Sequence, residues 1–143
     1  MSIETDSIVD WDAFSRARSE LGSGFVRILG YFREDGDKAV ARIEEAMLRK
    51  DAAGLVGPAD RLKSEARQFG AEPLGDLAED IETTARRSLE MRLFPDELLP
   101  AVAKLRPLYE ETIDLFEKEA NPLAQRHRQG ARAEANNQDF GRI

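Results

Sequence analysis

One stretch decides the fold: residues 59–70, which read ADRLKSEARQFG. A helix advances about 100° per residue, and on such a wheel one side gathers mostly polar side chains within about 60° of residue 60. These are Val56, Asp60, Lys63, Ser64 and Arg67. The opposite side is apolar, with Leu55, Leu62, Ala66 and Phe69. The stretch therefore predicts an amphipathic helix. Its apolar side enters a core, and its other side exposes a carboxylate, two cations and a hydroxyl beside one exposed valine.

Apolar residues recur at helical spacing on both sides of this stretch, and no segment shows the sustained period of two that marks a half-buried strand. Helices are predicted over approximately residues 10–22, 25–32, 40–47, 51–69, 73–85 and 96–120. Longer helices joined by short connections bury their apolar stripes best in a bundle. We therefore predict an all-α fold, an up-and-down antiparallel four-helix bundle with an extra short N-terminal helix.

Several residues predict where these helices begin, end or bend. Asp10 is a suitable N-cap for the first helix, Gly70 a suitable C-terminal stop for the helix that contains Asp60, and Pro73 a favourable first residue for the next. The run Glu-Asp-Gly-Asp at 34–37 is expected to interrupt or bend the chain. Pro107, inside the last apolar pattern, is expected to kink that helix or divide it.

The 143 residues are most simply one domain with a single core. We predict an N-terminal extension at residues 1–7, the helical bundle at 8–120 and a flexible tail at 121–143. The tail is rich in Gln, Arg, Ala and Asn and has few apolar anchors. It holds the only histidine, His127, which lacks a predicted helical scaffold.

Charge and composition exclude several classes of function. The formal charge is −7, and since residues 121–143 contain four Arg and two acidic residues, the first 120 carry about −9. Because nucleic acid is also negatively charged, a domain this acidic is not expected to bind it. No apolar run approaches the roughly 20 residues of a membrane span, no secretory signal is evident, and no cysteine is present. We predict a cytoplasmic, monomeric protein without disulfides.

The polar side of the 59–70 helix has an ordinary explanation. Lys63 lies one turn after Asp60, and an i,i+3 ion pair on a helix surface stabilises the helix by only a few tenths of a kcal/mol. Charged surfaces of this kind are common on bundle helices. Spacing alone therefore favours a solvated face over a functional site.

The order of the residues favours function, because it resembles the signature of histidine-containing phosphotransfer (HPt) domains. In that pattern a histidine is followed by Leu at plus two, Lys at plus three, Gly or Ser at plus four and Gly at plus ten. Leu62, Lys63, Ser64 and Gly70 match these positions counted from Asp60, and the resemblance extends over about residues 8–120. It implies a signalling module, not an enzyme, that docks response-regulator receiver domains and, in addition, a sensor histidine kinase.

The resemblance also implies roles for individual residues. Lys63 would offset the charge of the transferred phosphoryl group, Ser64 would keep the helix surface low, and Arg67 could add a second cationic contact. Val56 and Arg61 would join these three residues in contacting the partner, while Leu62, Phe69 and Gly70 would be structural. The family needs no cofactor of its own, because the Mg²⁺ is expected on the partner receiver domain.

Asp60 departs from the pattern, since it stands at the position of the phosphoacceptor histidine. A carboxylate repels an incoming phosphoryl group and is shorter than an imidazole, so we expect phosphotransfer to be lost. Two origins fit: a natural pseudo-HPt protein, or a histidine-to-aspartate variant of an active one. His127 is a poor replacement acceptor.

Two other functions compete with this reading. The first is a helical-bundle adaptor with no relay ancestry, in which the motif match arose by chance. The second is a carboxylate-bridged metal bundle, which requires Glu-x-x-His pairs on facing helices. Because the predicted core contains no histidine, we predict no metal site.

Overall fold

The computed structural model of the chain describes residues 8–120, and these residues form helices without any strand. The predicted extension at 1–7 and tail at 121–143, with His127, lie outside the described residues. The elements are α2 (Trp11–Leu21), the 3₁₀ turn η1 (Gly22–Gly24), α3 (Phe25–Leu48), α4 (Ala52–Gln68), α5 (Glu72–Glu90), the 3₁₀ turn η2 (Asp96–Leu98) and α6 (Leu99–Ala120).

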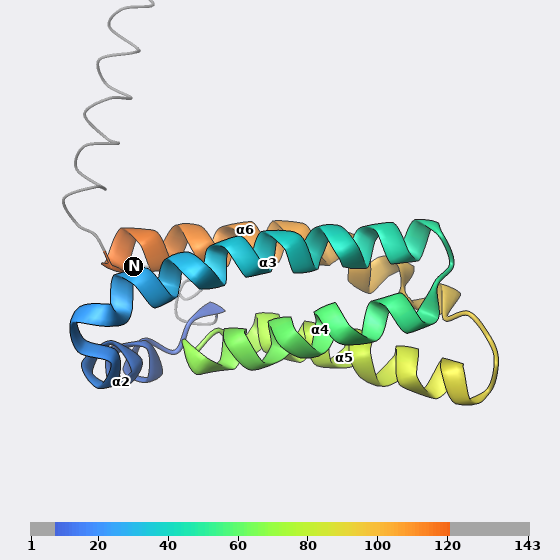
Figure 1. The fold of residues 1–143 in the computed structure, drawn as a ribbon, viewed down its shortest axis with the longest axis horizontal. Helices are drawn as coiled ribbons and strands as arrows, with labels where there is room; N and C mark the ends of the chain where they lie inside the picture. The colour runs from blue at the N-terminus through green and yellow to red at the C-terminus, as the bar shows by residue number, and fades with distance from the viewer. Residues whose placement is uncertain (1–7, 121–143) are drawn as a thin grey trace, which may run out of the picture.

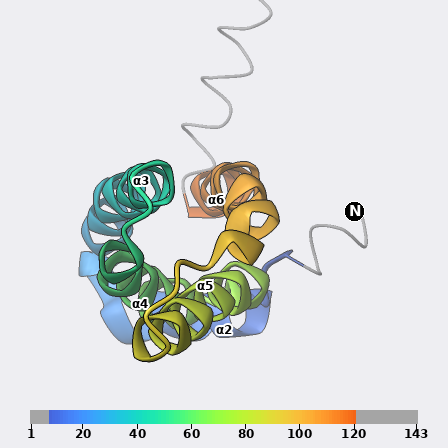
Figure 2. The same cartoon turned by 90° about the vertical axis from the view of Figure 1, so that its right-hand side faces the viewer.

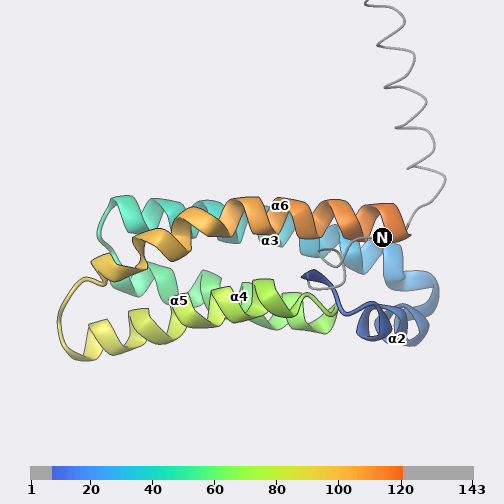
Figure 3. The same ribbon diagram turned by 180° about the vertical axis from the view of Figure 1, so that it is seen from behind.

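Four long helices, α3 to α6, lie side by side as an antiparallel bundle (Figure 1). The view along the bundle shows them around a common axis in chain order (Figure 2). From behind, α6 runs beside α3, and α5 beside α4 (Figure 3). The predicted all-α four-helix bundle with a short N-terminal helix is confirmed. Within residues 8–120 no helix is both long enough and apolar enough to cross a membrane.

The short helix α2 closes one end of the bundle (Figure 1). Its predicted cap is confirmed, because the Asp10 carboxylate accepts hydrogen bonds from the backbone N–H groups of Asp12 and Ala13. The Asp10 N–H in turn donates to the Gly70 carbonyl at 2.8 Å, just after α4 ends. Gly70 has φ of 85°, and a Cβ there would lie 2.6 Å from the Asp10 carbonyl oxygen. Glycine is therefore required for this exit.

The prediction of a break at residues 34–37 is wrong, because α3 continues without interruption from Phe25 to Leu48. The physical reason is Gly36, which is buried against α6. A Cβ on Gly36 would lie 2.5 Å from the Tyr109 ring, so the missing side chain makes room for that tyrosine. The glycine serves helix packing here and not chain reversal.

Proline does not divide the last helix either, since α6 runs through Pro107 as one element. Proline at this position removes the bond to the carbonyl of Ala103. Both residues are exposed, so water can satisfy that carbonyl. Pro58 is a second proline inside a helix, α4, and the sequence pattern had not singled it out.

The core contains a group of aromatic rings in contact, with centroids 5.1–6.3 Å apart. Its members come from α2, α3, α6 and the end of α4: Phe14, Phe25, Phe32, Phe69, Tyr109 and Phe116. Full burial of one such ring stabilises the fold by about 1.5–3 kcal/mol. On α4, Ala59 and Leu62 are fully buried, which fixes the side of the helix that faces solvent.

Candidate functional site

Asp60 lies in the middle of α4, between two fully buried neighbours, Ala59 and Leu62. Its side chain is 51% exposed. Within residues 8–120 its one ion-pair partner is Lys63, whose Nζ lies 3.3 Å from Asp60 Oδ1. A carboxylate in this position is anchored by its backbone but keeps oxygen lone pairs open to solvent or to a ligand.

Lys63 is held more closely by α5 than by Asp60. Its Nζ donates to Glu82 Oε1 at 2.7 Å, and the Glu82 side chain is only 8% exposed. Glu82 Oε2 accepts from Arg86 Nε at 3.0 Å. The hydrogen bond to Glu82, reinforced by Asp60, raises the pKa of Lys63 above its ordinary value. Lys63 is therefore a firmly charged, positioned cation that links α4 to α5.

Arg67 points away from Asp60 and across to α5. Its guanidinium donates to Asp76 and Glu79 at 2.8 Å each and lies 3.6 Å from Glu72. The hydrogen bonds to Glu79 and then Asp76 raise the pKa of Arg67 further above its ordinary value. The side chain lies over Gly75, where a Cβ would come within 2.8 Å of Arg67 Cγ. Arg67 thus ties two helices together, and three carboxylates already offset its charge.

The other predicted contact residues occupy different surroundings. Ser64 is exposed next to Lys63, as the wheel suggests. Arg61 lies towards α3, 3.9 Å from Asp35 and 4.0 Å from Glu65. Val56 is not the exposed valine that was expected, because it is partly buried and packs on the core. The structure therefore brings Asp60, Lys63 and Ser64 together and directs Arg61 and Arg67 to neighbouring helices.

The helices that form this site lie within a match to a known protein family. The family model described as the Hpt domain matches residues 27–115, which include most of α3, all of α4 and α5 and most of α6. The chain belongs to the Hpt domain family. Comparison with curated proteins and with solved structures finds no significant match.

Membership of the Hpt family supplies a coarse function. Hpt domains are phosphocarrier modules of two-component phosphorelays and not classical enzymes, and they interact with response-regulator receiver domains and kinases. Asp60, Lys63 and Glu82 all lie within the matched residues. Within residues 8–120 no group of three or more metal-ligating side chains is arranged to hold an ion.

Acidic residues of α5 pair with two cations of α4, Lys63 and Arg67. We call the set of Asp60, Lys63 and Arg67 on α4 with Glu72, Asp76, Glu79, Glu82 and Arg86 on α5 the α4–α5 face. The α5 members recur at helical spacings of three or four. That spacing marks them as one stripe in the sequence, but it does not show that the stripe faces Lys63 and Arg67.

Glu65 is a second feature that the sequence did not single out. Its Oε1 is buried with no hydrogen-bond partner among the described residues. Burial, followed by the nearby charge of Asp35, raises the pKa of Glu65 above its ordinary value. Glu65 lies on the α3 side of α4, next to Arg61, and so outside the α4–α5 face.

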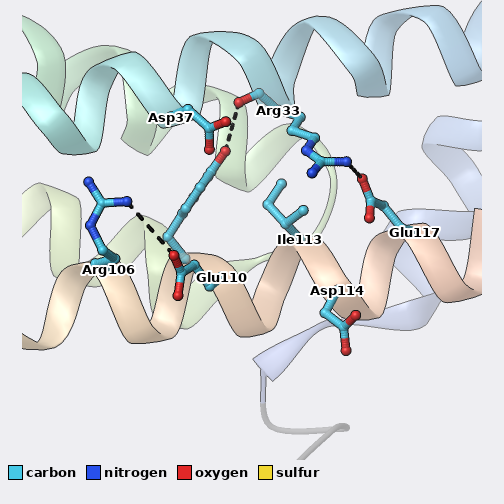
Figure 4. Close-up of a pocket in the computed structure, with 8 residues that line it drawn as sticks. Arg33, Asp37, Arg106, Glu110, Ile113, Asp114 and Glu117 are labelled. Carbon is cyan, nitrogen blue, oxygen red and sulfur yellow. Dashed lines mark hydrogen bonds and ion pairs between the residues drawn. The ribbon is translucent and has the colours of Figure 1, made fainter. Parts of the chain in front are cut away.

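The opposite side of this Hpt bundle has a hollow between α3 and α6, of about 510 Å³ (Figure 4). We call it the α3–α6 hollow. Its lining is mostly charged: Arg33, Asp37, Arg106, Tyr109, Glu110, Ile113, Asp114 and Glu117. Arg33 pairs with Glu117, and Arg106 binds Glu44 through two hydrogen bonds of 2.8 and 3.0 Å. Tyr109 donates from its hydroxyl to the Arg33 carbonyl at 2.8 Å. These contacts join the two helices.

Proposed function

We propose that this chain is an Hpt protein that docks receiver domains through the α4–α5 face and that does not itself carry phosphate. In this proposal Asp60 occupies the position of the phosphoacceptor histidine. The observation that carries it is the placement of Asp60: half exposed at mid-α4, on a rigid helix, with Lys63 at 3.3 Å and the exposed Ser64 beside it. The adaptor alternative gives no reason for this arrangement inside an Hpt match.

The chemistry of position 60 supports the loss of transfer. A relay histidine attacks an acyl phosphate with a neutral ring nitrogen, and the protein around it mainly positions groups and offsets charge. A carboxylate adds a negative charge beside the incoming phosphoryl group. It also sits on a shorter side chain, further from the phosphorus. Lys63 remains in place to offset charge, but the nucleophile is missing.

The surroundings of Asp60 support docking without transfer. The ion pair with Glu82 on α5 positions Lys63, so the orientation of Lys63 does not depend on a histidine at position 60. The small, exposed side chain of Ser64 leaves the next turn of α4 open to a close approach by a partner. Transient signalling partners typically bury a small interface, of order 1,200 Å² or less, and the exposed side of α4 together with α5 offers a surface for one.

Binding to a panel of purified receiver domains, measured by calorimetry, tests the docking part. We expect at least one receiver to bind, and Lys63→Glu to weaken that binding by about tenfold or more, because the substitution reverses the charge next to Asp60. The matched control is Lys104→Glu, which makes the same change at an exposed position of α6. If no receiver binds, or if both variants weaken binding equally, docking through the α4–α5 face is wrong.

A further inference from the structure

The Asp60 carboxylate is half exposed at the centre of the proposed docking surface. Resting on the proposed receiver docking, we propose that Asp60 makes the docking dependent on a divalent cation. Its carboxylate contacts a water on the Mg²⁺ that the receiver holds. The chain consequently selects the unphosphorylated, metal-loaded receiver over the phosphorylated one.

The first support is the charge of the α4–α5 face. Five carboxylates and three cations contribute to it, which leaves two negative charges in excess. The three cations are all engaged by carboxylates of α5, at 2.7–3.0 Å for their closest contacts. A receiver site that holds Mg²⁺ through carboxylates is itself acidic. Two acidic surfaces repel each other unless a cation lies between them.

The second support is the availability of Asp60. Lys63 lies nearer to Glu82, at 2.7 Å, than to Asp60, at 3.3 Å, so the lysine compensates the buried carboxylate first. Half of the Asp60 side chain remains exposed. Exposed ion pairs of this kind are worth at most about 1 kcal/mol, so Asp60 can exchange or share its partner readily.

The third support is the chemistry of the cation. Mg²⁺ prefers oxygen ligands and gives up its waters reluctantly, so a protein carboxylate frequently meets it through a bound water. A water ligand at about 2 Å from the metal, hydrogen-bonded at about 2.7 Å to a carboxylate, extends the reach of a short side chain. Asp60 lacks the length of a phosphorylated histidine, and a bridging water supplies that length.

Phosphorylation of the receiver should act in the opposite direction. An acyl phosphate on the receiver aspartate adds negative charge next to the metal, and its oxygens take up coordination positions that waters held. Asp60 would then face phosphoryl oxygens in place of metal-bound water. The chain therefore fits a role in holding the resting receiver.

The experiment measures the Kd of a receiver that binds, with Mg²⁺ and with EDTA, at matched ionic strength. We expect Mg²⁺ to tighten binding by about tenfold, the order expected for one charge-assisted hydrogen bond. In Asp60→Asn the Mg²⁺ effect should largely disappear, because the amide keeps the shape but not the charge. Glu111→Gln removes one charge from an exposed position on α6, and it should retain the full effect.

Beryllofluoride, which mimics the acyl phosphate, provides the second arm: the loaded receiver should bind the unmodified chain several-fold more weakly than the Mg²⁺ form does. Binding that is insensitive to Mg²⁺, or a Mg²⁺ effect equally large in Asp60→Asn, would overturn the inference while leaving receiver docking intact. Tighter binding of the beryllofluoride form would also overturn it. Absence of binding to every receiver under all conditions would contradict the proposed function itself, and this inference with it.

Discussion

The two long sides of the bundle use charge in different ways. At the α3–α6 hollow, Arg33 and Arg106 bind Glu117 and Glu44 on the facing helix, and Tyr109 bonds to the α3 backbone. At the α4–α5 face, Lys63 and Arg67 also bind carboxylates of the neighbouring helix. Asp60, however, is left half exposed. The first arrangement stabilises the fold. The second stabilises it and also leaves a carboxylate half exposed, which is why we propose the docking site there.

The largest expected effect comes from breaking the α3–α6 side at Gly36. Gly36→Leu must displace the Tyr109 ring, which lies 2.5 Å from the position of the new Cβ, and we expect a loss of about 3 kcal/mol of unfolding free energy. Urea denaturation measures it. Gly30→Leu on the same helix is the control, because nothing lies within 4 Å of its Cβ position, and stability should stay within about 1 kcal/mol of the parent. Equal losses would show that Gly36 is not a packing contact.

Glu82 should have the next largest effect, on the α4–α5 side. Glu82→Gln removes the buried charge that Lys63 and Arg86 share, and we expect a loss of about 1–2 kcal/mol by the same measurement. The variant should also lower the pKa of Lys63 towards the ordinary value, which NMR titration of the lysine can follow. A Lys63 pKa that does not move would contradict the assigned contact.

The pH dependence of this contact has a defined sign. The folded state holds the Lys63 proton more tightly than the unfolded chain does, because its pKa is raised above 10.5. The stabilisation is therefore complete below that value and is lost as the pH rises through the folded pKa. In Glu82→Gln this alkaline loss should begin at lower pH.

The smallest effect on stability is expected at Asp60. Asp60→Asn removes one exposed i,i+3 ion pair, so the unfolding free energy should change by no more than about 0.5 kcal/mol. A change above 1 kcal/mol in thermal or urea unfolding would show that Asp60 serves the fold. The contrast with Glu82, one helix away, separates a carboxylate that stabilises the fold from one that the fold does not need.

Much of the fold follows from local patterns in the sequence. Helical periodicity predicted the bundle, and Asp10 and Gly70 marked helix ends correctly. Pro73 lies in the first turn of its helix, one residue after the start at Glu72. The errors concern contacts between distant residues. From the sequence, Gly36 predicts a break in the helix. The structure shows that it instead makes room for Tyr109, which lies 73 positions later in the sequence. Helix α6 continues through Pro107 because the residue whose carbonyl loses its hydrogen-bond donor, Ala103, is exposed to solvent.

The site was predicted in part, for the same reason. The wheel placed Asp60, Lys63 and Ser64 together, and they are neighbours on one surface of α4. A wheel cannot show which neighbouring helix competes for a long side chain. Arg67 turns to α5, Arg61 lies towards α3, and Val56 packs partly on the core. Their roles in docking stay predictions.

The most direct test of the central claim is phosphoryl uptake by Asp60→His. The chain and this variant are each incubated with a receiver phosphorylated at its aspartate, and acid-labile phosphate on the chain is followed by phosphate-affinity electrophoresis. We predict that the variant becomes labelled, that the unmodified chain does not, and that Lys63→Glu in the variant background reduces the labelling. No labelling of Asp60→His by any receiver that binds it would contradict the claim that position 60 is the phosphoacceptor position.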